Sequence, residues 1–252
     1  MNAINKYKIR TDISKTLGSV TVYRIEALRD FGDVKKGDLG GWIEKESNLS
    51  QRGTCWIYDE AIVVQNAQVS GKAIVNCHAK VYHYAHVCDN AIVSGNSRIY
   101  DNAIIEDSAL INDNAIISGN ARISNQAEIY NNVEILGDAH IYGCASIFNN
   151  VQIYDNVKVH GTIEMYGNIR IDGDAEITSI TDYYVGKNTW SSGRYFVYTR
   201  SNKKWKVGCF YGTSEELIKK AYEDSELSGR NYERIVKYVE ETYNDIERCE
   251  GC

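Results

Sequence analysis

The sequence of 252 residues contains no proline and no long apolar segment. Proline makes up about 5% of an average protein and removes a backbone donor, so its absence suits a chain built from hydrogen-bonded strands. No apolar run approaches the roughly 20 residues that a membrane-spanning helix needs. The first residues, MNAINKYKIRTDISK, lack the apolar core of a secretory signal peptide. We therefore expect neither a membrane protein nor a secreted one.

The cysteines form neither a disulfide framework nor a complete metal site. There are seven of them, an odd number, scattered between Cys55 and Cys252. This usage is typical of a reducing compartment such as the cytoplasm. Cys249 and Cys252 have the spacing of half a zinc site, but neither a second pair nor a histidine lies near them in the sequence. We predict no metal site and no cofactor.

The sequence does contain a repeat of six residues. Residues 54–179 divide into 21 such units without an insertion or a deletion. The fourth position is Ile or Val in 20 units, with Met165 as the exception, and the second position is small in most units. The sixth position is Asp, Asn or Gly in 17 units.

This repeat predicts a solenoid. Side chains alternate between the two sides of a strand, so the second and fourth positions line an interior while the third and fifth point outward. Gly, Asn and Asp tolerate left-handed backbone angles, so the sixth and first positions carry the turns. Three strands and three turns make a coil of 18 residues, and seven coils give a prism about 34 Å long.

The spacing of Ile129, Val133 and Ile135 resembles that of the hexapeptide-repeat left-handed β-helix family. The resemblance implies a mainly β fold, a three-sided parallel β-helix with left-handed coils. The residue after the aliphatic position is often Gly in that family, whereas here it is often Tyr, as at Tyr82 and Tyr100.

Enzymes of this family place a catalytic histidine on or beside a loop outside the coil, or hold zinc between subunits. The unbroken repeat leaves no such loop, and its register contains all five histidines: His78, His83, His86, His140 and His160. His78 and His83 have the spacing of two zinc ligands in γ-class carbonic anhydrases. The third ligand would fall on Trp42 or Ser47. We therefore predict neither acyl transfer nor zinc chemistry, and no catalytic residue.

Three regions are expected: an N-terminal cap at 1–47, the β-helix at 48–180 and a C-terminal ββα module at 181–252. In the cap, residues 20–25 alternate like a strand and residues 40–46 read as an irregular first coil. In the module, residues 195–199 and 205–211 read as two strands. Thr213 and Glu216 then have the spacing of a helix capping box.

The cap and the module also resemble a set of mostly uncharacterised phage and prophage proteins. The resemblance lies in the run RIEALRDFGDVKKGDLGGWIEKESNLS, residues 24–50, followed by CWIYDEA. It implies a setting in the cytoplasm of a bacterial host cell and brings no catalytic residue with it.

Residues 18 apart stack on one face, so the outward columns can be written down. One column is apolar over four coils: Trp56, Ile74, Ile92 and Leu110. Exposed apolar patches of this kind usually mark interfaces. Either the flanking regions cover this column, or a second copy of the chain packs on it in a homo-oligomer, a trimer or a dimer.

A second candidate surface is basic. Residues 48–180 contain 7 basic and 15 acidic residues, whereas residues 181–212 contain 6 basic and 1 acidic. The residues proposed for this surface lie on a hairpin: Arg194, Arg200, Lys203, Lys204, Trp205 and Lys206. Cations beside aromatics suit nucleic acid. An acidic protein partner and a solvated hairpin remain open.

Together these features predict a non-enzymatic interaction protein that binds a host protein, for example as an inhibitor of a bacterial defence system of the CRISPR-Cas type. Flat faces without a cleft suit macromolecular recognition better than turnover. Two alternatives stay open. One is a small-molecule-binding, acyltransferase-like or carbonic-anhydrase-like oligomer with sites between subunits. The other is nucleic-acid binding through the basic hairpin.

Overall fold

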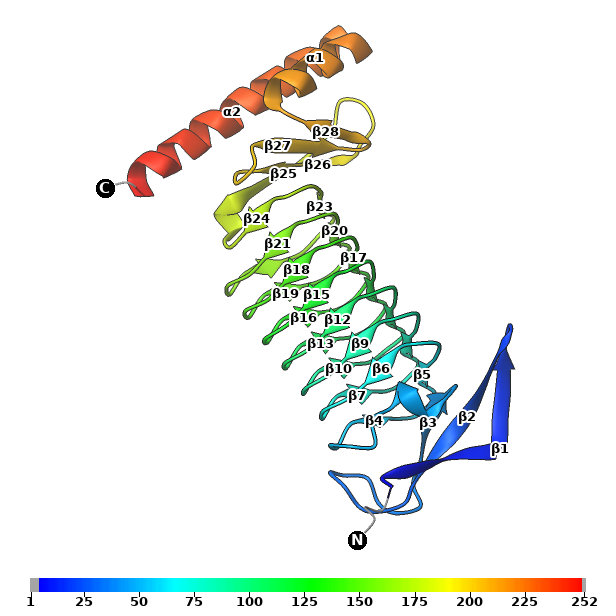
Figure 1. Ribbon diagram of the computed structural model, residues 1–252. Helices are drawn as coiled ribbons and strands as arrows, with labels where there is room; N and C mark the ends of the chain where they lie inside the picture. Colours follow the sequence, from blue (N-terminus) through cyan, green and yellow to red (C-terminus); the bar gives the residue numbers. More distant parts are fainter. Residues whose placement is uncertain (1–4, 251–252) are drawn as a thin grey trace.

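The computed structural model describes residues 5–250 and is a rod, with the two ends of the chain at opposite ends of the solenoid (Figure 1). Three parallel sheets form seven regular coils, and one irregular coil precedes them. An antiparallel sheet and two helices follow the last coil. The predicted mainly β fold, a three-sided parallel β-helix with a cap and a C-terminal module, is confirmed.

Each sheet forms one face of the solenoid. The strands of the regular coils pair in parallel with the strand 18 residues further along, whereas Trp42 of the irregular coil pairs with Ile62, 20 residues further along. Face 1 consists of β4 (Trp56–Ile57), β7 (Ile74–Val75), β10 (Ile92–Val93), β13 (Leu110–Ile111), β16 (Glu128–Ile129), β19 (Ser146–Ile147) and β22 (Glu164–Met165). Face 2 consists of β3 (Leu39–Ile43), β5 (Ile62–Val63), β8 (Lys80–Val81), β11 (Arg98–Ile99), β14 (Ile116–Ile117), β17 (Glu134–Ile135), β20 (Gln152–Ile153) and β23 (Arg170–Ile171). Face 3 consists of β6 (Gln68–Val69), β9 (His86–Val87), β12 (Ile104–Ile105), β15 (Arg122–Ile123), β18 (His140–Ile141), β21 (Lys158–Val159) and β24 (Glu176–Ile177).

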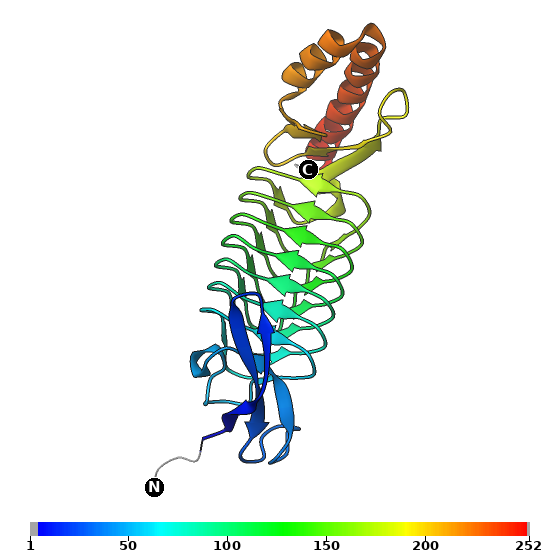
Figure 2. The same cartoon turned by 90° about the vertical axis from the view of Figure 1, so that its right-hand side faces the viewer.

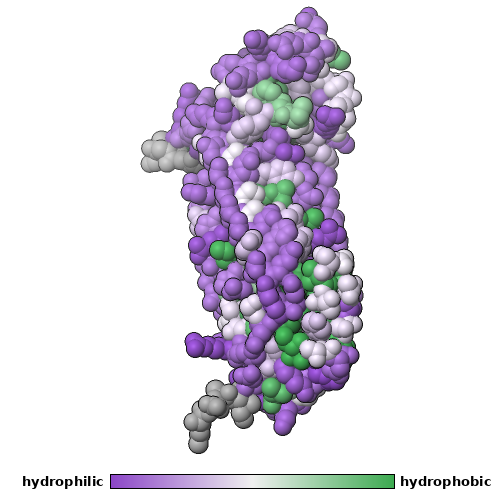
Figure 3. All heavy atoms as spheres, turned by 45° about the vertical axis from the view of Figure 1, so that its right-hand side comes forward, coloured by the Kyte–Doolittle hydropathy of each residue, from purple (hydrophilic) through white to green (hydrophobic). Residues whose placement is uncertain are grey.

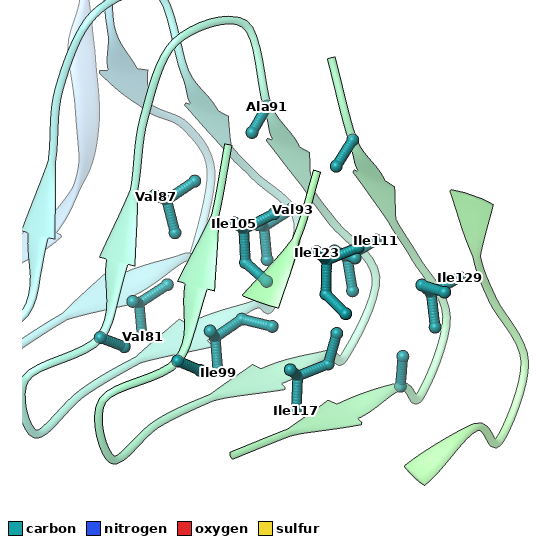
Figure 4. Close-up of a cluster of buried hydrophobic side chains, with 14 of the residues drawn as sticks. Val81, Val87, Ala91, Val93, Ile99, Ile105, Ile111, Ile117, Ile123 and Ile129 are labelled. Carbon is teal, nitrogen blue, oxygen red and sulfur yellow. The ribbon is translucent and has the colours of Figure 1, made fainter. Parts of the chain in front are cut away.

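The core is a column of aliphatic side chains along the axis of the solenoid. The fourth-position residues of all three faces point inward, as Figure 4 shows for Val81, Ile99 and Ile117 among others. These three side chains have no exposed surface, and neither does Met165. Burying each such side chain contributes about 1.5–3 kcal/mol before the entropy of ordering is subtracted.

The turns depend on the sixth position in two ways. First, its backbone is left-handed in 20 of the 21 units, the exception being Ser179, and φ is 57° at Asp101 and 58° at Gln65 and His83. Second, its side chain accepts a hydrogen bond from the backbone N–H of the sixth-position residue one coil later. Asn131 N donates to Asp113 Oδ2 over 2.9 Å in this way. Asp and Asn meet both requirements, whereas Gly meets only the first.

At the N-terminal end, β1 (Tyr7–Leu17) and β2 (Val20–Ala27) form an antiparallel hairpin that extends the sheet of face 2. Strand β1 was not expected from the sequence. The hairpin lies over the lower coils (Figure 2), where its Ile13 and Val20 pack near Val64. The irregular coil continues through η1 (Glu46–Asn48). Inside it, buried Lys6 donates from Nζ to the carbonyl oxygen of Cys55 over 2.8 Å and closes this end of the core.

At the other end, η2 (Ile180–Asp182) leads into a sheet of β25 (Tyr183–Lys187), β26 (Tyr195–Thr199), β27 (Lys204–Val207) and β28 (Phe210–Gly212). Helices α1 (Ser214–Asp224) and α2 (Glu226–Glu250) follow. The strand expected at 205–211 is divided in two by a turn at Gly208, where φ is 58°. The capping box is confirmed, since Thr213 N donates to Glu216 Oε2 over 2.8 Å. Within residues 5–250, neither helix has the length and apolarity needed to cross a membrane.

The double role of the sixth position can be tested at Asp113, which also accepts a bond from Asn131 Nδ2 over 2.8 Å. We expect Asp113→Gly to lower the free energy of unfolding by about 1–3 kcal/mol, because the Asn131 N–H loses its acceptor while the turn is kept. Asp113→Asn keeps both the acceptor and the turn propensity, so it should cost less than about 1 kcal/mol. Urea unfolding followed by circular dichroism measures both values. Equal stability of the two variants would contradict this account of the turn.

Candidate active site

The structure places the predicted apolar column of face 1 partly under the cap. Trp56 is only 1% exposed, because the rings of Tyr7 and Phe31 pack edge-on against it at centroid distances of 6.2 Å and 5.3 Å. Of the two alternatives for the column, cover by a flanking region therefore holds at Trp56, which is not available as an interaction residue. The three other residues of the column remain half-buried on the outside of the coils: Ile74, Ile92 and Leu110.

Two residues of the predicted basic hairpin are buried, and one of them attaches the C-terminal module to the last coil. Trp205 is fully buried, and its Nε1 donates to Ser214 Oγ. Lys206 is also buried and forms an ion pair with Asp172 over 2.5 Å. Trp205 therefore cannot contact a nucleic acid, contrary to expectation, and only about a tenth of the Lys206 side chain is exposed to a ligand.

The remaining hairpin residues differ in exposure. Arg200 lies 3.8 Å from Glu247 on helix α2, and Lys204 is half-buried. Arg194 and Lys203 are exposed. Among the hairpin residues, Lys206 thus places its charge against an acidic residue of the β-helix, Asp172.

The five histidines lie on different parts of the solenoid, and four have a polar side-chain partner. His86 and His140 lie on face 3, 3.0 Å from Ser70 Oγ and 3.4 Å from Ser124 Oγ. Burial lowers the pKa of His140, and the charge of Arg122 adds to this effect. His160 pairs with Glu176 over 2.9 Å. His78 is exposed at the turn between faces 1 and 2, and His83 lies at the opposite edge of face 2. His78 and His83 are therefore not brought together as zinc ligands.

His83 and Asp101 form a histidine–carboxylate pair. The two residues are 18 apart, and His83 Nδ1 lies 2.9 Å from Asp101 Oδ1. The second carboxylate oxygen accepts the backbone N–H of Gly119 over 3.2 Å, and Gln65 Oε1 accepts the backbone N–H of His83 over 2.8 Å. Both members are thus held from the coils on either side. With Nδ1 donating to the carboxylate, Nε2 is the acceptor of the neutral imidazole.

Tyrosines surround this pair. The rings of Tyr82 and Tyr100 stack in parallel on face 2 with centroids 5.0 Å apart, and the ring of His83 stands edge-on to Tyr82 at 4.9 Å. Tyr84 follows in the turn and is 66% exposed. Burial raises the pKa of Tyr82, so its phenol stays neutral at physiological pH. The side chains of His83 and Asp101 are 42% and 43% exposed, so the pair is open to a substrate.

Two cations lie beside these tyrosines on face 2. Lys80 and Arg98 occupy the third positions of strands β8 and β11 and are exposed. In the part of the chain that the structure describes, neither forms an ion pair. The site therefore combines a histidine–carboxylate pair, an aromatic wall and local positive charge.

Face 3 carries one group of possible metal ligands, formed by Cys88, Asp89 and Glu106, whose ligand atoms lie within 4.8 Å of one another. Burial raises the pKa of Cys88 to about 12, helped by the charge of Asp89, so the thiol is protonated at neutral pH. Glu106 already pairs with Arg122. These contacts oppose metal binding. At the C-terminus, Cys249 is exposed, and Cys252 lies outside the described residues.

No family model matches the sequence. A segment of 66 residues, 26% of this chain, is 41% identical to the "Uncharacterized acetyltransferase YdcK" of Escherichia coli (strain K12). The match spans 19% of the length of that relative. Together with the coils, it supports a hexapeptide-repeat β-helix.

This similarity overturns the prediction that the chain is not an enzyme. The prediction rested on the lack of a loop thrown out from the coils to carry a histidine. The structure shows that no such loop is needed to orient one, because the turn itself presents His83 and the next coil supplies Asp101. The signal was present in the sequence, since both residues occupy the sixth position of units 18 residues apart.

The role of Lys206 as an anchor generates a stability prediction. We expect Lys206→Met to lower the free energy of unfolding by about 1–3 kcal/mol, because Asp172 loses a buried charged partner and keeps only Arg170. Lys203→Met is the matched control, since Lys203 is exposed on the same hairpin and should change stability by less than about 0.5 kcal/mol. Urea unfolding checks both. A Lys206 variant as stable as the Lys203 variant would argue against the anchor.

Proposed function

We propose that the protein is an acyltransferase in which His83 is the general base. The observation that carries the proposal is the pairing of His83 Nδ1 with Asp101, which leaves Nε2 on an open surface. The similarity to a protein named as an acetyltransferase supports it. Acetyl is therefore the first group to test.

The pair would act in proton transfer. An amine or hydroxyl of the acceptor attacks the carbonyl carbon of the acyl donor, and His83 Nε2 takes the proton that the acceptor loses. Asp101 stabilises the imidazolium that forms. When the bond between the acyl carbon and the leaving group breaks, the imidazolium returns the proton to the leaving group. The acceptor ends acylated and His83 ends neutral.

The surroundings of the pair would bind the substrates. The stacked rings of Tyr82 and Tyr100 offer a flat apolar surface next to the imidazole. Lys80 and Arg98 would attract an anionic donor to the same face, where opposite charge raises the rate of encounter. These contacts support a donor that combines an apolar part with negative charge.

The proposal predicts how variants change the rate of acetyl transfer from acetyl-coenzyme A to a panel of amines. His83→Gln should lower kcat/KM by about 10²–10⁴-fold, because the proton acceptor is lost. Asp101→Asn should lower kcat more than it changes KM, since it disturbs only the orientation and charge of the imidazole. His78→Gln is the control, because His78 is exposed at the other edge of face 2. Full activity of His83→Gln would exclude this mechanism.

A second proposed function is binding to a macromolecule of the bacterial host, including inhibition of a defence complex. The resemblance of residues 24–50 to phage and prophage proteins supports it. Face 1 offers the surface, because it carries half-buried aliphatic residues at the third positions of its early coils and a stacked aromatic ladder at the fifth positions of its later ones: Ile74, Ile92 and Leu110, then Tyr130, Phe148 and Tyr166. Beyond Leu110 the third-position column itself turns polar, with Glu128, Ser146 and Glu164. By contrast, the hydrophobic residues on the face seen in Figure 3 form small separate spots among hydrophilic ones.

Face 1 can be tested with Ile92→Glu and a matched control, Ile104→Glu, which places the same charge at a half-buried position of face 3. We expect the wild type to recover one host protein in stoichiometric amount from a nuclease-treated lysate, and Ile92→Glu to lose it. Light scattering on the purified chain tests whether face 1 binds a second copy of the chain instead of a host protein. A wild-type dimer or trimer that Ile92→Glu alone dissociates would assign the face to self-association. Equal behaviour of both variants would exclude face 1.

A further inference from the structure

A hollow, here called the junction pocket, lies at the end of face 2, where the β-helix meets the C-terminal sheet. It is lined by residues from strands β20, β23, β26 and β27 and from the loops beside them: Gln152, Asn168, Arg170, Arg194, Tyr195, Val197, Lys206, Gly208 and Cys209. Among these lining residues, three are cationic and none carries a carboxylate. The hollow therefore offers positive charge to a ligand.

The positive charge of the junction pocket is only partly neutralised by the neighbouring carboxylate of Asp172. Asp172 accepts bonds from Arg170 Nε and Nη2 over 2.8 Å and 3.0 Å, and it also pairs with Lys206. One carboxylate thus balances two cations. Arg194 is exposed and has no ion-pair partner among residues 5–250. The three cations outnumber Asp172, and Asp155 adds a negative charge that acts on Arg170, so the pocket keeps a net positive charge, which suits a phosphate.

The cations are held in place by the fold. The Arg170 guanidinium lies over the ring of Tyr154, 4.4 Å from its centroid, and the side chain of Lys206 is only 10% exposed. Because these donors are already ordered, a ligand would pay little entropy to organise them. Tyr195 is 42% exposed at the rim, with Lys187 Nζ 5.3 Å from the centre of its ring.

A ladder of asparagines ends at the same pocket. Along the turn between faces 1 and 2, each side-chain amide donates to the amide oxygen 18 residues later, from Asn96 to Asn114, Asn132, Asn150 and Asn168. The last bond, from Asn150 Nδ2 to Asn168 Oδ1, is 3.1 Å long. Asn168 Nδ2 has no acceptor in the described part of the chain. Hydrogen bonds aligned in a chain polarise one another, so the terminal amide is a strengthened donor.

We propose that the junction pocket binds the phosphate group of a small phosphate monoester. Arg194, Arg170 and Lys206 would neutralise the two charges of the phosphate, and Asn168 Nδ2 would donate to one of its oxygens. The guanidinium fork of Arg194 matches the geometry of phosphate oxygens, whereas Arg170 already uses Nε and Nη2 on Asp172 and contributes mainly its charge. Tyr195 would stack on a ring carried by the ester, because its exposed face lies at the rim.

This inference is independent of the proposed acyl transfer. Strand β8, which precedes His83, and strand β23, which carries Arg170, are five coils apart on face 2. At about 4.8 Å per coil, that separation is roughly 24 Å. A small ligand in the junction pocket would therefore not reach His83 of the same chain.

The test is calorimetric titration of the full-length protein with adenosine 5′-monophosphate and with inorganic phosphate, in a phosphate-free buffer at low salt. We expect both probes to bind, and Arg194→Gln to weaken binding about tenfold or more, since a charge-assisted contact is lost. Tyr195→Leu should weaken the nucleotide and leave inorganic phosphate unchanged. Lys203→Gln is the control, because Lys203 is exposed on the same module but does not line the pocket.

Three results would overturn the proposal. One is no heat of binding for either probe up to about 10 mM, a concentration at which even a weak site would be occupied. Another is equal affinity of the Arg194→Gln and Lys203→Gln variants, which would show general attraction to a basic module. The third is equal binding of acetate, which would show that the site does not select a dianion. Because Arg194 has no ion pair to lose, its variant should fold as the wild type does, and thermal unfolding confirms this.

Discussion

The parallel hydrogen-bonded register of 18 residues is the constraint on which the rest of the structure depends. Each coil bonds to the coil above and below it, so any residue lies opposite the residue 18 positions away. The ladders of Asp and Asn at the turns follow from this, because every acceptor meets the same donor in the next coil. The His83–Asp101 pair is one step of such a ladder in which a histidine replaces the usual turn residue.

A ladder of this kind has two open ends, and the chain closes each by a different means. At the N-terminal end, the cap places Lys6 and the rings of Tyr7 and Phe31 on the first regular coil. At the C-terminal end, the closing contacts are largely polar. Lys206 meets Asp172, and the side-chain amide of Asn202 meets Asp174. The polar closure leaves excess positive charge at the junction.

Much of the fold could be predicted because it repeats. A single position, the aliphatic fourth residue, indicated the interior of all three faces. The caps could not be predicted to the same depth. The burial of Trp56 depends on where the chain places Phe31 and Tyr7, and because these residues lie outside the repeat, their positions cannot be derived from it. Strand β1 was missed although Tyr7, Ile9 and Ile13 alternate. The pairing of His83 with Asp101 follows from the register, but it was not predicted, because a catalytic histidine was expected only on a loop or at a zinc site.

The fixed rise per coil also means that the number of coils sets the distance between the two ends of the β-helix. Because every coil has the same 18 residues and the same three faces, loss or duplication of one coil would shift the junction pocket by about 4.8 Å and keep its orientation. Loss of a single six-residue unit would instead turn everything beyond it by one third of a revolution. Changes by whole coils therefore alter the length of the β-helix and keep the relative orientation of its two ends, whereas changes by single six-residue units also alter that orientation. Evolution can vary the spacing of the two ends without changing which way they face.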